Sequence, residues 1–383
     1  METFTYKIYA SLSELPTSWD EVAVENAFLQ TPYLKVLEDS SPINMRCYYI
    51  GIYENDILIG VALTQYLDIN KLESFGERDQ CIKTYIRNFI FKNFSGHVLF
   101  LGNNLVSGHN SYAYKKHLSF ETISKIMLEY CAEMLVFLKQ KNITIHLITF
   151  KDFYQIEATE LKKFDFKNIY EIHAQPNMIL NLNTKWKSKE DYNRELTKKY
   201  RDQYKRARKK FTGIAIEELS LEKIEQNEAK IYEFYKFVAK NASFNTFILS
   251  ESHFSTFKKK CPKHFKLFGY FDNHLLVGFH TIFQNGDTLE TYFLGYDEKV
   301  QKEKMLYLNM LYNMTEFGIE NHFKRIIFGR TALEIKSSIG AQPIMMSGFM
   351  FHKNRWINKL LPKIFPRLEP EMIWQQRHPF KEN

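Results

Sequence analysis

A ten-residue pattern occurs twice in this chain of 383 residues. Residues 51–60 read GIYENDILIG, residues 269–278 read GYFDNHLLVG, and the two copies align without a gap. In each copy an acid and an Asn separate two runs of apolar residues, which is the sequence pattern of a tight β-hairpin. The repeat therefore predicts either a common hairpin that is used twice or a duplicated domain.

The sequence around the two hairpins favours duplication. Helical sequence precedes each hairpin, and a strand, a long amphipathic helix and a buried strand follow it. The expected segments are 14–37, 97–102, 119–141 and 143–150 in the first half, and 221–240, 251–260, 288–296, 302–322 and 324–330 in the second. We therefore predict an α/β (α+β) protein with two tandem units, 1–180 and 181–383, each a mixed sheet flanked by helices.

Composition excludes several classes of protein. The four cysteines (Cys47, Cys81, Cys131 and Cys261) form no CxxC pair, which argues against a disulfide scaffold or a zinc ribbon and favours a reducing compartment. The N-terminal residues lack the pattern of a signal peptide, and no run of about 18 apolar residues occurs. We therefore expect a cytoplasmic protein without a metal site.

Positive charge is concentrated in one segment. Residues 194–210, RELTKKYRDQYKRARKK, hold nine Lys or Arg residues and two acids, so they carry seven of the eight net positive charges. The composition predicts a basic helix on which Arg201, Lys205 and Arg208 share one face. That face suits the phosphate groups of an acceptor substrate; a solvated helix is the alternative. The nearly neutral remainder argues against a nucleic-acid partner.

The segment 356–370, WINKLLPKIFPRLEP, is basic and amphipathic. Helices of this kind can lie in the surface of a bilayer. We therefore expect either peripheral contact with the inner membrane through this tail, or packing of the tail on the protein body.

Three motifs resemble those of a known protein family. They are SKEDYNRELTKKYRDQYKRARKK (188–210), MLYLNMLYNMTEFGIENHFKRIIFGRT (305–331) and TALEIKSSIGAQP (331–343). They are similar to the second unit of tandem GNAT proteins, namely the Fem-type aminoacyltransferases of peptidoglycan synthesis and the BioF-like acetyltransferase-domain proteins. The resemblance implies acyl or aminoacyl transfer to an amine of a cell-envelope or natural-product precursor, which can be lipid-linked. The alternative is a non-catalytic module that binds a phosphate-bearing precursor or nucleic acid.

The donor of such a reaction would be a thioester or an ester. Single-unit GNAT enzymes hold the pyrophosphate of CoA on a glycine-rich segment before their third helix. Residues 296–307 contain no glycine, and residues 102–120 contain two at a different spacing. Acyl-CoA is therefore one expected donor, and a carrier protein or a tRNA is the alternative.

Glu290 and Tyr292 are the predicted catalytic pair. In the GNAT units that this chain resembles, the strand at 288–296 borders the donor cleft. Acyl transfer to an amine needs a base for the amine proton and an acid for the leaving group. We assign these roles to Glu290 and Tyr292; the alternative is that both are ordinary strand residues.

Other polar residues are predicted to bind substrate. Some begin a helix or follow a buried strand, where anions and ligands of α/β proteins bind. These candidate donor-binding residues are Gln301, Lys302, Lys304, Arg330, Thr331 and Lys336. The turn-rich loop 102–112 supplies the candidate acceptor-binding residues Asn103, Asn104 and His109, although any turn needs such residues.

Overall fold

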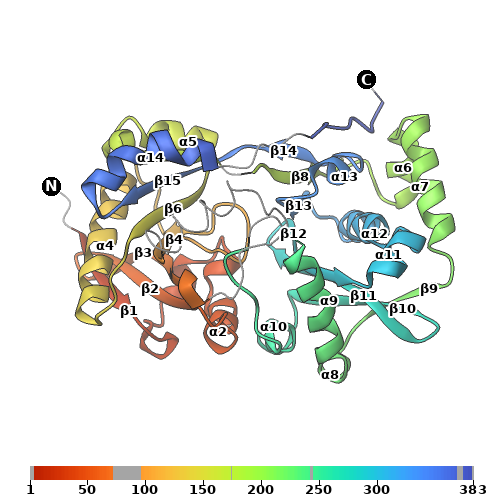
Figure 1. The fold of residues 1–383 in the computed structure, drawn as a ribbon, viewed down its shortest axis with the longest axis horizontal. Coiled ribbons are helices and arrows are strands. Elements are labelled where there is room, and N and C mark those ends of the chain that lie inside the picture. Colours follow the sequence, from red (N-terminus) through yellow and green to blue (C-terminus); the bar gives the residue numbers. More distant parts are fainter. Residues whose placement is uncertain (1–3, 72–95, 174, 242–244, 369–373, 382–383) are drawn as a thin grey trace. The chain divides into compact units, whose positions relative to one another are not determined.

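The computed structural model describes residues 4–71, 96–173, 175–241, 245–368 and 374–381 (Figure 1). The chain forms two compact units: unit 1 comprises residues 1–174, 243–250 and 345–372, and unit 2 comprises residues 175–242, 251–344 and 373–383. Each unit has one mixed sheet and a hydrophobic core of its own. The predicted α/β (α+β) class, with two mixed sheets flanked by helices, is confirmed.

Unit 1 is built on a sheet with the strand order β1-β2-β3-β4-β6-β15-β7, and β5 pairs with β3. The strands are β1 (Phe4–Tyr9), β2 (Met45–Glu54), β3 (Ile57–Asp68), β4 (His97–Leu101), β5 (Tyr112–Tyr114), β6 (Leu147–Tyr154), β7 (Tyr170–His173) and β15 (Met346–His352). The helices are α1 (Trp19–Val22), α2 (Thr31–Asp39), α4 (Phe120–Gln140), α5 (Gln155–Leu161) and α14 (Arg355–Leu368). The buried side of α4, including Met127 and Met134, packs with strand residues such as Ile50 and Ile148 in the main core.

Unit 2 is built on a sheet with the strand order β14-β8-β13-β12-β11-β10-β9. The strands are β8 (Asn177–Asn181), β9 (Ile214–Glu218), β10 (Phe265–Asp272), β11 (Leu275–Asn285), β12 (Thr288–Tyr296), β13 (Arg325–Gly329) and β14 (Gln342–Ile344). The helices are α6 (Lys189–Glu195), α7 (Lys198–Lys210), α8 (Leu221–Gln226), α9 (Glu228–Lys240), α10 (His253–Lys260), α11 (Glu298–Lys304), α12 (Leu306–Glu320) and α13 (Leu333–Ser337). The core contains residues of α12, α7 and the sheet, among them Met310, Ala207 and Ile282.

Both repeated segments form the predicted hairpin. The turn between β2 and β3 has Asn55 and Asp56 at φ of 49° and 62°, and the turn between β10 and β11 has Asn273 and His274 at 47° and 67°. Positive φ at both central residues is the type I′ geometry, which Asn and Asp tolerate better than most residues do. In each unit a parallel strand pair follows, β4 with β6 and β12 with β13. The duplication predicted from the sequence is therefore present in the backbone.

The strand beside the last parallel strand comes from the other half of the chain in each unit. In unit 1, β15 lies between β6 and β7, and in unit 2, β8 lies between β13 and β14. Each inserted strand is antiparallel to both of its neighbours. The two units therefore do not meet at a single boundary at 180/181. The strand β15 is hydrogen-bonded in the sheet of unit 1, and the strand β8 is hydrogen-bonded in the sheet of unit 2.

Three expected helical segments are interrupted. The segment 221–240 forms α8 and α9, which Asn227 separates. The segment 14–37 does not form one helix but contains α1, a short 3-10 turn and α2, because Pro32 opens α2 as a new helix. The segment 302–322 contains the end of α11 and all of α12, separated by Met305 at a φ of 52°. The strand expected from residue 143 begins at Leu147.

Candidate functional site

The parallel strands β12 and β13 pair over only three residues in unit 2. Thr288, Leu289 and Glu290 pair with β13, whereas β12 continues beside β11 to Tyr296. A bulge in β12 lies just beyond Glu290, where Tyr292 and Phe293 stand opposite Thr281. The Thr281 hydroxyl donates to the carbonyl of Phe293 at 2.6 Å and accepts from its N–H at 2.9 Å. The sheet is therefore interrupted at a defined point next to the predicted catalytic pair.

Glu290 lies at the residue where β12 leaves β13. Its side chain is buried, and the residue is 5% exposed. Burial raises the pKa of the Glu290 carboxyl to about 8, although the positive charge of Arg325 and a hydrogen bond from Asn285 act in the opposite direction. A carboxyl group with this pKa can exchange a proton near neutral pH, which is the property that a general base or acid requires.

Tyr292 is held by residues of α10. Its hydroxyl is hydrogen-bonded to Nε2 of His253 at 3.0 Å, and the two rings stack. The ring of Phe257 packs edge-on against Tyr292 and also contacts Phe283, which is the β11 partner of Glu290. Cross-strand partners lie on the same face of a sheet. Glu290 and Tyr292 therefore share the face that α10 covers. His253 was missed in the sequence, where nothing links it to Tyr292.

The sheet of unit 1 is interrupted at the position in β3 that corresponds to Thr281 in β11. The repeat aligns Gly60 with Gly278, and the same offset places Leu63 opposite Thr281. In unit 1 the backbone of Leu63 bonds to Gly102 and to Ser111, so residues 103–110 leave the sheet as a loop at this point. The strand registers also place Phe100 at the position of Glu290. The buried carboxyl group is thus a feature of unit 2.

The loop of unit 1 contains the predicted residues Asn103, Asn104 and His109. Asn103 is buried: its amide donates to the Tyr33 hydroxyl at 3.0 Å, and its Oδ1 accepts from the N–H of Leu105. The side-chain Nδ2 of Asn104 and Nε2 of His109 are buried atoms without a hydrogen-bond partner among the described residues. Two buried polar atoms of this kind can bind a polar ligand.

Charged residues that were not predicted from the sequence lie beside the same loop. His109 Nδ1 lies 3.2 Å from the Glu157 carboxylate. Burial acts to raise the pKa of Glu157, but the hydrogen bond and charge of His109, together with a hydrogen bond from the N–H of Tyr154, outweigh burial and lower the pKa. At the end of β6, Lys151 pairs with Asp152, which has a φ of 62°. The only sequence signal for this pair was a Lys-Asp dipeptide after an apolar run.

The three predicted residues on α11 lie at its surface or tie it to neighbouring segments. Lys302 forms an exposed pair with Glu298, Lys304 Nζ donates to the carbonyl of Thr212, and Gln301 accepts from the N–H of Tyr307. At the start of α11 the carboxylate of Asp297 accepts hydrogen bonds from the N–H groups of residues 299 and 300. A carboxylate of the protein itself thus occupies the place where a pyrophosphate was expected.

The loop after β13 holds Arg330, Thr331 and Lys336. Thr331 and Ala332 have φ of 65° and 48°, and both are exposed. Lys336 is buried on α13, and its ammonium nitrogen donates to the carbonyls of Arg330 at 2.6 Å and Gly329 at 3.3 Å. Burial lowers the pKa of Lys336 to about 7. The Lys336 side chain therefore holds α13 to the residues at the end of β13.

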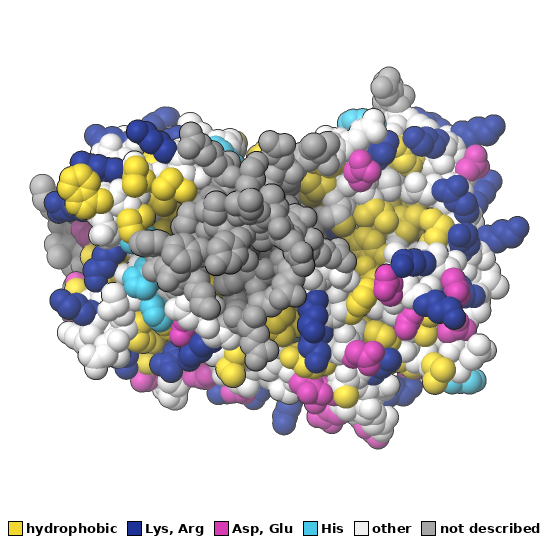
Figure 2. All heavy atoms as spheres, in the orientation of Figure 1, with side chains coloured by type: hydrophobic (Ala, Val, Ile, Leu, Met, Phe, Trp, Pro, Cys, Tyr) yellow, Lys and Arg dark blue, Asp and Glu magenta, His cyan; other side chains and the backbone are white. Residues whose placement is uncertain are grey.

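The predicted basic helix is α7, along which Lys and Arg side chains gather in Figure 2. Arg208 lies against α12: it donates to Asn309 and Asn313 and pairs with Glu316 at 2.5 Å. Lys205 is exposed and Arg201 is partly exposed. The three residues share one side of the helix as predicted, but the structure gives Arg208 partners within unit 2.

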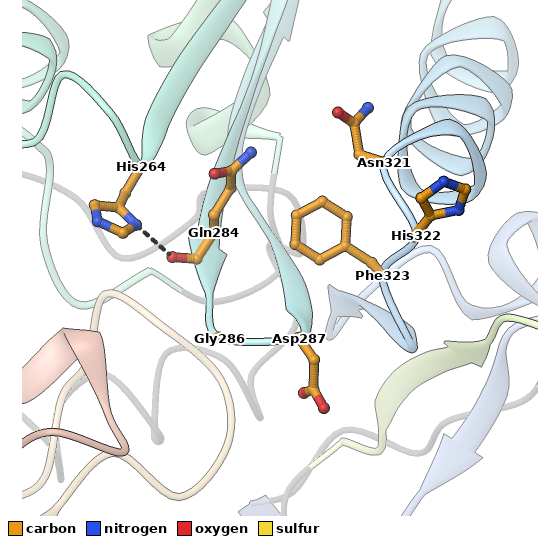
Figure 3. A pocket seen from close by; sticks show the side chains of 7 residues that line it. All are labelled: His264, Gln284, Gly286, Asp287, Asn321, His322 and Phe323. Atoms are coloured by element: carbon orange, nitrogen blue, oxygen red, sulfur yellow. Dashed lines mark hydrogen bonds between the residues drawn. The ribbon is translucent and has the colours of Figure 1, made fainter.

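A hollow of about 420 Å³ lies at the turn between β11 and β12 (Figure 3). Its lining comes from that turn, from the residue before β10 and from the residues after α12, and includes His264, Asp287 and His322. None of the predicted site residues lines it. In the described part of the chain, no group of three or more His, Cys, Asp or Glu residues is suited to a metal ion. None of the helices in the described ranges has the length and hydrophobicity of a transmembrane segment.

Comparison with known proteins identifies the fold. No protein-family model and no curated protein matches the sequence. The crystal structure of FemX aligns with 93% of this chain and 99% of that chain, with a TM-score of 0.56 and 11% identity. A conserved protein of unknown function from Bacteroides thetaiotaomicron VPI-5482 aligns with 91% of this chain and 99% of that chain, with a TM-score of 0.50 and 9% identity. The chain therefore has the tandem GNAT-like fold of Fem-type proteins.

Proposed function

We propose that this protein transfers an acyl or aminoacyl group to an amine, and that the reaction takes place in unit 2 at Glu290. The observation that supports this most strongly is the buried carboxyl group at the point where β12 leaves β13, with a pKa of about 8. Unit 1 has Phe100 at the equivalent position, so of the two repeated positions only the one in unit 2 has a carboxyl group. The likeness to FemX supports the class of reaction through the shared fold.

In the proposed mechanism the amine nitrogen attacks the carbonyl carbon of a thioester or ester. The Glu290 carboxylate accepts the proton that the amine loses as the new C–N bond forms. The C–S or C–O bond to the leaving group then breaks, and the Tyr292 hydroxyl donates a proton to the leaving sulfur or oxygen. His253, hydrogen-bonded to that hydroxyl, orients it and is positioned to return a proton to it.

The start of α11 does not fit the pyrophosphate of CoA. Binding there would require free N–H groups, and those of Lys299 and Val300 already bond to the Asp297 carboxylate. A phosphate group beside that carboxylate would also be repelled by its charge. We therefore propose that the donor is a thioester on a carrier protein or an ester on a tRNA.

We propose an amine of a cell-envelope or natural-product precursor as the acceptor. Arg201 and Lys205 on α7 would bind its phosphate groups. In unit 1, the buried atoms of Asn104 and His109 are candidates for binding a separate polar ligand. Arg208 is left out of this proposal because Glu316 already neutralises its charge. A non-catalytic role in ligand binding is the alternative. Unit 1 has Phe100 at the position of Glu290, and its loop holds the buried Asn104 and His109 atoms that have no partner among the described residues.

The test is amide formation by wild-type protein and by Glu290→Gln, with a panel of acyl thioesters and aminoacyl esters as donors and amine-bearing envelope precursors as acceptors. Glu298→Gln is the matched control, because Glu298 is exposed on α11 and pairs only with Lys302 among the described residues. We expect Glu290→Gln to lower the rate roughly 100-fold and Glu298→Gln to leave it unchanged. Precursor binding without any turnover by the wild-type protein would favour the non-catalytic role.

A further inference from the structure

We propose that α14 is an interfacial helix that docks unit 1 on a bilayer containing anionic lipid. The inner side of α14 packs on the protein. Leu361 and Phe365 join a small core cluster with Met350 of β15, and Phe365 also stacks edge-on with Tyr170 of β7. Asn358 accepts a hydrogen bond from the N–H of His352 at 2.8 Å. These contacts fix which side of the helix faces away from unit 1.

The outer side of α14 carries an apolar stripe. Trp356 is 77% exposed and Leu360 is 46% exposed, four residues apart on the helix. Ile364, another four residues on, is partly exposed. Residues at this spacing lie one above the other on a helix. An indole and two aliphatic side chains thus form a continuous apolar stripe without a covering element among the described residues.

A basic stripe runs beside the apolar one. Arg355, Lys359 and Lys363 follow the same spacing of four residues, one position earlier in each turn, and all three are exposed. Lys359 Nζ lies 5.6 Å from the centre of the Trp356 ring. The helix contains no acidic residue. In Figure 2 hydrophobic side chains lie among Lys and Arg side chains over α14.

The apolar and basic stripes together indicate an anionic bilayer as the partner of α14. A helix with an apolar face, flanking cations and a Trp can lie in the headgroup region, where the cations reach lipid phosphates and the indole enters the acyl boundary. The absence of acids removes repulsion from an anionic surface. The inference concerns unit 1 and does not depend on the proposed transferase reaction.

The test is flotation of the full-length protein with phosphatidylcholine vesicles and with vesicles that also contain 30% phosphatidylglycerol. We expect binding only to the anionic vesicles, and at least a tenfold loss for the double variant Trp356→Ser/Leu360→Ser and for Lys359→Glu/Lys363→Glu. The matched controls are Val136→Ser and Lys125→Glu on α4, because Val136 is 55% exposed and the Lys125 side chain is 51% exposed in the same unit. Thermal unfolding of each variant checks that unit 1 remains folded.

Trp356 also provides a direct signal. The indoles of Trp19 and Trp186 are buried, and Trp374 packs partly buried against the core of unit 2. A blue shift of the tryptophan emission on adding anionic vesicles should therefore be lost in Trp356→Phe and retained in Trp374→Phe. Equal flotation of wild type and Trp356→Ser/Leu360→Ser would overturn the proposal, and so would the absence of any binding to anionic vesicles. A dimer in solution that Trp356→Ser dissociates, without vesicle binding, would instead assign the stripe to a second copy of the chain.

Discussion

Nε2 of His253 lies 3.0 Å from the hydroxyl oxygen of Tyr292, and the planes of the two rings are 21° apart. His253 begins α10 and is fully buried, whereas Tyr292 lies in the bulge of β12. The pair joins the helix to the interrupted part of the strand. The hydroxyl that we propose as the acid is therefore positioned by a residue 39 positions earlier in the chain.

We expect Tyr292→Phe to lower kcat roughly 100-fold with little change in KM, because the variant keeps the ring contacts but loses the hydroxyl, which supplies the acidic proton and bonds to His253. Steady-state kinetics of amide formation measures this effect. Tyr296→Phe, on the same strand, is the matched control and should retain the wild-type kcat. A kcat for Tyr292→Phe equal to that of this control would exclude Tyr292 as the acid.

Arg208 should contribute to stability. It is partly buried between Tyr204 and Tyr312 and pairs with Glu316, so Arg208→Ala leaves a partly buried carboxylate without its cation. We expect the free energy of unfolding to fall by roughly 3 kcal/mol in urea denaturation. Lys205→Ala, one turn earlier and exposed, should change it by about 0.5 kcal/mol or less. Unfolding of Arg208→Ala at the wild-type urea midpoint would show that the ion pair is not structural.

The buried Lys336 predicts a pH dependence of stability. Burial lowers its pKa to about 7 in the folded chain, and an unfolded lysine titrates at about 10.4. Between these values the unfolded chain binds the extra proton, so this residue makes the protein more stable as pH rises. Relative to Lys336→Met, wild-type protein should gain about 1 kcal/mol per pH unit between pH 7.5 and 9.

Lys302→Met is the control for this experiment, because the Lys302 side chain is 70% exposed. The difference between wild type and Lys302→Met should stay constant over the same pH range. A constant difference for Lys336→Met as well would mean that Lys336 keeps an ordinary pKa in the folded protein.

The start of α11 allows a prediction about the donor. Asp297→Ala removes two hydrogen bonds to the helix and should cost about 1 kcal/mol of stability, whereas Asp297→Asn keeps an oxygen acceptor and should cost less. Asp297→Ala also frees the N–H groups of Lys299 and Val300 and removes the negative charge, so it should bind CoA more tightly than wild type in isothermal titration. Equal CoA binding by Asp297→Ala and wild type would show that this carboxylate is not what excludes a pyrophosphate from the start of α11.

Local elements were largely predictable from the sequence. Asn55 and Asn273 identified both hairpins because few residues tolerate the left-handed turn, and the apolar spacing of 119–141 identified α4. The exchange of β8 and β15 was not predictable. Both strands have the apolar sequence of a central strand. The sequence does not show which sheet such a strand joins, because backbone hydrogen bonds form in the same way with a neighbouring strand from either half of the chain.

The arrangement of the candidate site was predictable only in part. The fold resemblance led to Glu290 and Tyr292, which lie at the interruption of the sheet. His253 was not predictable, because a helix and a strand 39 residues apart meet only in the folded state. The sequence showed that Arg208 is charged but not that it pairs with Glu316, which lies on another helix. An arginine in an ion pair and an arginine that binds a ligand cannot be distinguished from the sequence.

The pH profile of kcat/KM for amide formation, measured for wild type and for Glu290→Gln, tests whether Glu290 is the base of the reaction. Only the carboxylate form of Glu290 can accept a proton, so the wild-type rate should rise with pH around an apparent pKa of about 8. Glu290→Gln should be roughly 100-fold slower and should lack that step. A Glu290→Gln profile with the wild-type rate and the same step near pH 8 would contradict the assignment of Glu290 as the base.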